Sequence, residues 1–274
     1  MLIAFRLQML RSVVFSGLPI NRPNGIRGVV GILIVLVCTP IYGTVFNWPS
    51  GGWTAGSPAA GQTLSQSFTS INPNDITLSI KNGSPTQSAT WQSGYPQISA
   101  SPLTGGLTGV QAVQLALASE GSTASYIRTT VKFNTPVINL SFQIWDVDAF
   151  AGQFADKIFN IQAIGSGGVT VGPTSVTSEV SGYNTISGTG LSTVVLGTAN
   201  ADNNTNQGTI DITFSGPITQ FSFDWSNNDS GLGKQAIALG PLTYTAVPEP
   251  STGWVVSVLS IIAFIPRFSS RGRS

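Results

Sequence analysis

The residues of this chain best suited to chemistry are carboxylates that follow an aromatic run. Trp145-Asp146-Val147-Asp148 closes an alternating segment, and Asp156 follows eight residues after Asp148. Side chains at i and i+2 of an extended strand lie on one side, so Asp146 and Asp148 would repel each other unless a cation or a proton lay between them. Calcium is the oxygen-seeking ion that suits such a set. We therefore predict a calcium site at Asp146, Asp148 and Asp156, with solvated carboxylates at a strand end as the alternative.

Aromatic residues in or beside loops offer a second kind of site. Exposed rings of Trp91, Tyr95 and Trp145 would stack on sugars through apolar contact, as carbohydrate-binding modules do. The alternative is that such side chains fill the ends of a core, which is what we expect of Phe223 and Trp225.

The inventory of side chains excludes several classes of enzyme. The 274 residues include no histidine, which rules out Ser-His-Asp and Cys-His catalysis and His-ligated metals. The single cysteine, Cys38, lies in a segment that we expect to be removed, so the mature chain can form no disulfide. Asp146 with Asp224 would be the carboxylate pair of a polysaccharide hydrolase, but no nucleophile elbow or phosphate-binding glycine loop is present. We therefore predict that the protein is not an enzyme, and we keep the hydrolase as the weakest alternative.

Charge is sparse and unevenly distributed. Only 8% of the residues are charged, against about 25% in an average globular protein, and this argues against a nucleic-acid partner. Residues 44–246 contain five basic and ten acidic residues, a formal net charge of −5, and the other seven basic residues lie in the two flanks. An acidic body between basic, apolar ends indicates export rather than catalysis.

The N-terminal flank is typical of a secretory signal. Arg22 and Arg27 precede a nine-residue apolar run, Val29 to Val37, and the helix-breaking segment 39–43 follows. Nine residues are too few to span a hydrocarbon layer of ~30 Å permanently, which disfavours the alternative of a membrane anchor. We therefore assign residues 1–43 to a signal peptide read by the general secretion machinery, with cleavage near Gly43.

The C-terminal flank has the most specific order of motifs in the chain. The two prolines of Val247-Pro248-Glu249-Pro250 keep the backbone extended, and the apolar stretch Trp254 to Ile265 follows. Arginines then hold the tail on the cytoplasmic side, namely Arg267, Arg271 and Arg273.

This order resembles the PEP-CTERM sorting signal of exported proteins of Gram-negative bacteria. The resemblance covers about the last 27 residues and implies an exosortase, a membrane-embedded cysteine transpeptidase, as the partner. By the resemblance, Val247, Pro248, Glu249 and Pro250 form the sorting motif. Arg267, Arg271 and Arg273 form the stop after a hydrophobic transmembrane helix. The apolar run is short for a span, with a rise of only ~18 Å, so anchoring in the membrane would be transient.

Between the flanks, residues 44–246 alternate apolar and polar side chains with period two. Clear examples are 76–80, 126–133, 140–144, 210–214 and 221–225. One face of each is apolar and the other polar, as in an antiparallel sheet with one solvated side. Residues 110–118 fit a helix or a strand. About ten such segments predict an all-β fold: a single antiparallel β-sandwich of jelly-roll type, like those common in exported PEP-CTERM proteins.

These observations predict three parts, a signal peptide (1–43), a β-sandwich domain (44–246) and a sorting signal (247–274). We expect a non-catalytic protein that is exported, anchored transiently in the membrane, processed at its C-terminus and placed on the cell surface or in the extracellular matrix. Its role would be structural or adhesive, with exopolysaccharide as a candidate partner. The alternative is a carbohydrate-binding module, with or without calcium.

Overall fold

The computed structural model describes residues 43–69, 75–83, 90–119, 125–231 and 233–247. All of them belong to the compact unit that spans residues 41–274. Of the predicted flanks, only Gly43 and Val247 are among these residues, so the signal peptide and the sorting signal otherwise lie outside the described part. Within the described ranges, no helix is long and apolar enough to cross a membrane.

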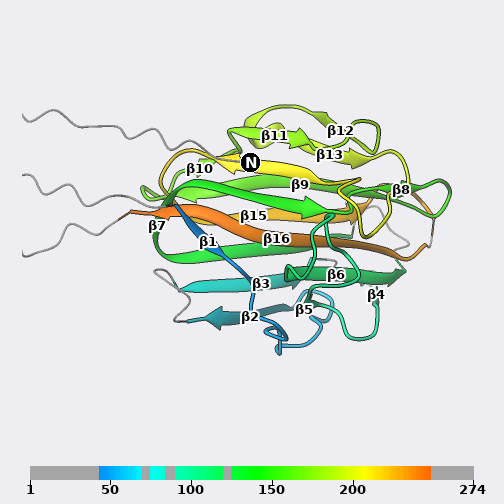
Figure 1. Ribbon diagram of the computed structural model, residues 1–274, viewed down its shortest axis with the longest axis horizontal. Helices are drawn as coiled ribbons and strands as arrows, with labels where there is room; N and C mark the ends of the chain where they lie inside the picture. The colour runs from blue at the N-terminus through cyan, green and yellow to red at the C-terminus, as the bar shows by residue number, and fades with distance from the viewer. Residues whose placement is uncertain (1–42, 70–74, 84–89, 120–124, 232, 248–274) are drawn as a thin grey trace, which may run out of the picture. The chain divides into compact units, whose positions relative to one another are not determined.

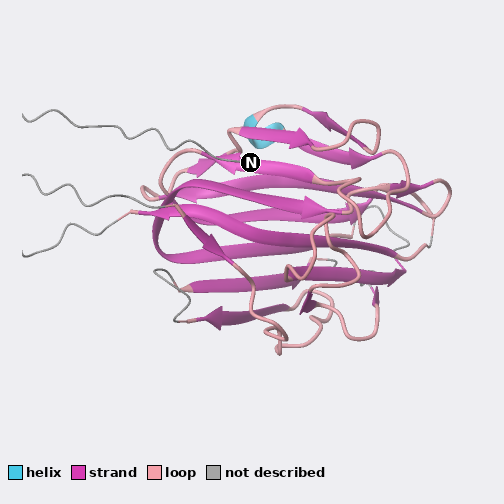
Figure 2. Cartoon of the chain, viewed as in Figure 1, coloured by secondary structure: helices cyan, strands magenta, loops and turns pink. Residues whose placement is uncertain are grey.

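The described part of the chain is all-β, as the alternation predicted (Figure 1). Its one helical element is a single 3-10 turn, η1 (Gly190–Ser192), drawn in cyan in Figure 2. The strands are β1 (Thr44–Phe46), β2 (Thr63–Phe68), β3 (Ile76–Asn82), β4 (Thr90–Trp91), β5 (Gln97–Ser99), β6 (Ala112–Ser119), β7 (Ile127–Trp145), β8 (Ala149–Phe150), β9 (Phe154–Gly165), β10 (Thr170–Val171), β11 (Ser175–Ser178), β12 (Asn184–Ser187), β13 (Val194–Gly197), β14 (Ile210–Phe214), β15 (Ile218–Asn227) and β16 (Gln235–Ala246).

These strands are joined by antiparallel pairing into one large sheet. Its main path runs in the order β12-β13-β9-β15-β7-β16-β6-β4, and the other strands pair onto it (Figure 1). The 19-residue strand β7 has four partners. Its first half pairs with β3 on one side and β15 on the other, and its second half pairs with β14 and β16.

Several predicted segments coincide with observed strands, and two details differ. Residues 210–214 are β14 and residues 76–80 lie in β3, whereas segments 126–133 and 140–144 belong to one strand, β7, instead of two. The ambiguous stretch 110–118 is strand β6. The predicted number of about ten strands is too low, because strands of two to four residues are too short to show a period-two pattern.

The prediction of one solvated side is wrong for β15. Phe221, Phe223 and Trp225 point into the core, as expected of the last two, but the intervening Ser222 and Asp224 are buried as well. β15 lies between β7 and β9, and long side chains from these neighbours extend over it, as Arg128 does over Asp224. A central strand is therefore covered on both faces although its sequence alternates.

Aromatic contacts join the partners of the two halves of β7. Phe142, in the second half, stacks on Phe221 of β15, a partner of the first half, with ring centroids 4.3 Å apart. Phe133, in the first half, meets Tyr244 of β16 edge-on at 5.3 Å. Side chains of both groups of strands thus fill one core.

Phe142→Ala should lower the free energy of unfolding by about 3 to 5 kcal/mol, because it removes a buried ring and leaves a cavity between β7 and β15. Urea unfolding followed by tryptophan fluorescence measures the loss. The exposed Val169→Ala serves as the control and should change stability by less than about 0.5 kcal/mol. Equal effects of the two substitutions would contradict this account of the core.

Candidate functional site

The three aspartates predicted to bind calcium lie in and around the turn that connects β7 to β9, and all are buried. The exposed fractions are 7% for Asp146, 4% for Asp148 and 0% for Asp156. The alternative of solvated carboxylates is therefore wrong. The expectation that Asp146 and Asp148 share one side of an extended strand is also wrong, because β7 ends at Trp145 and Asp146 adopts a left-handed φ of 64°.

Two of these carboxylates hold neighbouring segments together. Asp148 accepts a hydrogen bond at 2.7 Å from the backbone N–H of Ala201. Asp156 accepts one at 3.3 Å from the backbone N–H of Asp148 and one at 2.7 Å from Nε1 of Trp225. The backbone of Asp156 in turn donates to the carbonyl of Asp148. Asp148 and Asp156 therefore connect the β7–β9 turn to β15 and to the loop that contains Ala201.

Burial makes the charged form of each aspartate unfavourable. It raises the pKa of Asp146 to about 8, and the charges of Asp148 and Asp202 add to the rise. Burial also raises the pKa of Asp148 to about 6, although the hydrogen bond from Ala201 opposes the shift. The pKa of Asp156 lies well above its usual value because the group is enclosed and close to Asp148. Near neutral pH the cluster therefore retains protons.

One oxygen of the cluster could accept a further ligand. Oδ1 of Asp146 is buried and has no hydrogen-bond partner. In the described ranges, however, no three carboxylate, cysteine or histidine side chains converge in an arrangement that could hold a metal ion. A calcium ion at this place would depend on Asp146 together with backbone or water oxygens. Calcium binding by Asp146, Asp148 and Asp156 stays a prediction from the sequence.

Trp145 does not have the exposure that sugar stacking requires. Its indole is fully buried in a small cluster with Leu103, Ala112 and Ala238, and its Nε1 donates to Oε1 of Gln143 at 3.0 Å. It presents no ring face to solvent, and we withdraw it as a sugar-stacking residue. The sequence did not reveal this because the loop that covers it is contributed by a segment some 40 residues earlier.

Trp91 and Tyr95 are partly exposed and stay candidates for sugar stacking. Nε1 of Trp91 donates to the carbonyl of Pro58 at 3.0 Å, and the hydroxyl of Ser57 donates to the carbonyl of Tyr95. Both residues are thus tied to the coil that precedes β2.

Asp224, the other member of the carboxylate pair considered for hydrolysis, is an ion-pair partner. It is 1% exposed, and its two oxygens accept hydrogen bonds at 2.6 and 2.7 Å from Nε and Nη2 of Arg128. Asn160 donates a third at 2.8 Å. The hydrogen bonding and the charge of Asp224 also raise the pKa of Arg128 above its ordinary value. Asp224 is therefore held by fixed donors, and this arrangement does not favour proton transfer to a substrate.

Sequence reasoning missed Arg128 as the partner of Asp224. The two residues lie 96 positions apart and meet because Arg128 and Asp224 are directly opposite in the pairing of β7 with β15. Alternation of side chains along each strand indicates that both point away from the core, but it contains no information on which strands pair.

The free energy of unfolding should decrease as pH rises from about 5.5 to about 8.5 in the presence of a chelator. The folded chain binds protons at Asp146 and Asp148 more tightly than the unfolded chain, whose aspartates titrate near ~3.9, so the unfolded state gains relative stability as these protons dissociate. Melting temperatures at the two pH values measure the effect. Asp146→Asn should flatten the slope above pH ~6, and an unchanged slope in this variant would exclude Asp146 as its source.

If the aspartates bind calcium, as the sequence predicts, the ion should raise the melting temperature at pH ~8, because calcium binds the ionised carboxylate and burial raises the pKa of Asp146 to about 8. Calcium at about 10 mM exceeds the ~0.1 to 1 mM dissociation constants of extracellular calcium modules. Scanning calorimetry with calcium and with chelator should show a shift that Asp146→Asn abolishes. Identical melting curves would rule the calcium site out.

The chain was compared with protein-family models, with curated proteins and with solved structures. None of these comparisons found a match.

Proposed function

We propose that this protein is an exported, non-catalytic component of the bacterial cell surface or extracellular matrix, processed by an exosortase at its C-terminal Pro-Glu-Pro motif. The observation that carries the proposal is the order of Pro248-Glu249-Pro250, the apolar stretch Trp254 to Ile265 and the terminal arginines. Together with the signal-like segment before Gly43, this order supports passage through the general secretion machinery and transient anchoring in the membrane.

We infer that the body is a β-sandwich of jelly-roll type. Support comes from β7, which pairs with β3 and β15 in its first half and with β14 and β16 in its second. The contacts Phe142–Phe221 and Phe133–Tyr244 connect these two groups of strands through a common core, as expected when two sheets face each other. A rigid, disulfide-free body of this kind suits a structural or adhesive role.

The carboxylates favour a structural role over hydrolysis. Asp148 and Asp156 accept hydrogen bonds that connect separate segments, and Asp224 is held by Arg128 and Asn160. A retaining or inverting glycosidase needs two carboxyl groups that face a substrate across a cleft. Buried groups with protein partners on their oxygens are poorly suited to that reaction.

The position of the motif supports processing of a folded body. β16 ends at Ala246, and the backbone N–H of Val247 donates to the carbonyl of Pro136 at 3.0 Å. Pro248 follows directly in the sequence. A cut in the motif would therefore remove the sorting signal and leave β16, with its pairing to β6 and β7, complete.

In a Gram-negative host that contains an exosortase, the surface-exposed protein should lack the peptide that contains Arg273. Mass spectrometry of its C-terminus tests this, and the same host without the exosortase should retain the peptide. Glu249→Gln should reduce processing, whereas Glu179→Gln, which alters a glutamate outside the motif, should not. A surface-localised protein that still ends at Ser274 would overturn the proposal.

A further inference from the structure

Four of the five basic residues of the body lie on one face of the sheet. Arg128 and Lys132 are on β7, at positions that alternate with the buried Ile127, Val131 and Phe133, and so point away from the core. The other two are Lys81 of β3, which pairs with β7, and Lys157 of β9, which is separated from β7 by β15. We call this surface, defined by Lys81, Arg128, Lys132 and Lys157, the cationic face.

Strand register places these four side chains on the same side. Lys81 is directly opposite Arg128 in the pairing of β3 with β7, and Arg128 is opposite Asp224 of β15. On the other side of β15, Asp224 is directly opposite Phe159 of β9. Lys157 lies two residues before Phe159 and therefore projects to the same side. Residues opposite each other in an antiparallel pair project to the same side, so the four cations share one surface.

Three of the four cations have no ion-pair partner among the described residues, and the ammonium of one of them, Lys157, lies 5.3 Å from the centre of the Phe159 ring. Arg128 is engaged by Asp224, and a second carboxylate, Asp75, lies near Lys132 at the end of the face. Among the described residues, no acidic side chain forms an ion pair with Lys81, Lys132 or Lys157. The face is thus positive, although the body as a whole has a formal net charge of −5.

Hydroxyl groups and aromatic rings fill the space between the cations. One row across the strands consists of Ser65, Ser79 and Thr130 and ends at the buried Ser222; in it Ser65 and Ser79 form a hydrogen bond at 2.8 Å. At one end of the face the ring of Tyr126 packs edge-on against the ring of Phe159, and the two ring centroids are 6.5 Å apart. The guanidinium of Arg128 lies 5.5 Å from the centre of the Tyr126 ring.

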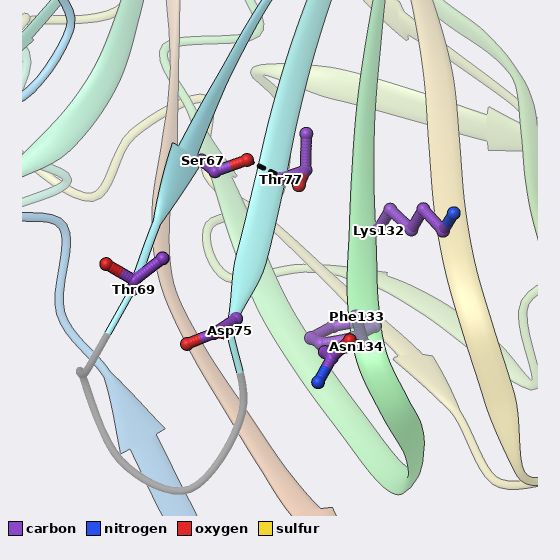
Figure 3. A pocket seen from close by; sticks show the side chains of 7 residues that line it. All are labelled: Ser67, Thr69, Asp75, Thr77, Lys132, Phe133 and Asn134. Atoms are coloured by element: carbon purple, nitrogen blue, oxygen red, sulfur yellow. Dashed lines mark hydrogen bonds between the residues drawn. The ribbon is translucent and has the colours of Figure 1, made fainter.

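A hollow of about 240 Å³ lies at the other end of the face. Figure 3 shows Ser67, Thr77 and Lys132 beside it, on the neighbouring strands β2, β3 and β7. Asp75 and Asn134 also line it, so this end offers an ammonium group, hydroxyls and an amide, whereas the carboxylate of Asp75 already has a partner. Such a set can bind a polar substituent that has both hydroxyl and acidic groups.

We propose that the cationic face binds an acidic polysaccharide, and this inference rests on the proposed location in the extracellular matrix. Hydroxyl and amide side chains offer hydrogen bonds to sugar hydroxyls, and the lysines attract carboxylate or sulfate substituents. Lys132 lies four residues from Arg128, the residue opposite Lys81, so Lys81 and Lys132 are separated by ~13 Å along the strands. This spacing lets successive cations meet carboxylates on separate sugars of a polyuronate, and it is far sparser than the charge of a nucleic acid, which has one charge per ~1.7 Å.

Binding of alginate, a linear polyuronate, to the purified full-length protein tests the proposal, with the neutral dextran and double-stranded DNA as comparisons. Alginate should bind, and its binding should weaken as the salt concentration increases. Dextran should not bind. Lys81→Gln, Lys132→Gln and Lys157→Gln should each weaken binding by roughly fivefold, as expected for one lysine near an anionic surface. Lys234→Gln, which removes the fifth basic residue of the body, should leave binding unchanged.

A substitution that adds a positive charge is expected to strengthen binding, and a gain of binding cannot result from a loss of folding. Ser65→Lys adds a cation to the face and should tighten alginate binding, whereas Ser175→Lys, on the exposed part of β11, should not. The proposal is overturned if alginate does not bind, if Lys234→Gln weakens binding as much as the other substitutions, or if DNA binds as tightly as alginate. Because the assay needs no exosortase, its failure would leave C-terminal processing untouched, and the reverse also holds.

Discussion

Strand β7 is the element on which the rest of the structure depends, because its backbone is hydrogen-bonded to four other strands. Its first half has β3 and β15 as neighbours, and its second half has β14 and β16. The change of partners occurs near Val137, which pairs with both β15 and β16. Each half must bury its apolar side chains in the same core, so rings from both groups of strands meet there.

The end of β7 also determines the environment of the aspartates. The left-handed backbone at Asp146 stops the strand and turns the chain into the core, where Asp148 and Asp156 meet backbone N–H groups and Trp225. Buried carboxyl groups are tolerated when they are hydrogen-bonded or protonated. Both conditions apply here. The hydrogen-bonded carboxyl groups join loops to strands, and they expose little charge to solvent.

Charge is separated in space as well as along the sequence. Basic side chains gather on the outer side of β3, β7 and β9, whereas Glu179 and Asp211 are hydrogen-bonded to Gln143 in the second half of β7. A protein with few charges can thus present one surface of definite sign while its overall net charge has the opposite sign. This separation is the observation on which the proposed binding of an acidic polysaccharide rests.

The sequence alone determined the all-β class, the inward and outward sides of strands such as β3 and β14, and the motif order of both flanks. These properties depend on neighbouring residues, which is why period two and local order reveal them. Pairing of distant strands was decided by tertiary structure: it brought Arg128 to Asp224, covered Trp145 with an earlier loop, and buried Asp146, Asp148 and Asp156. It also assembled the cationic face from three strands. Such contacts depend on which elements pack together, and the packing of the whole chain, not the local pattern, selects them.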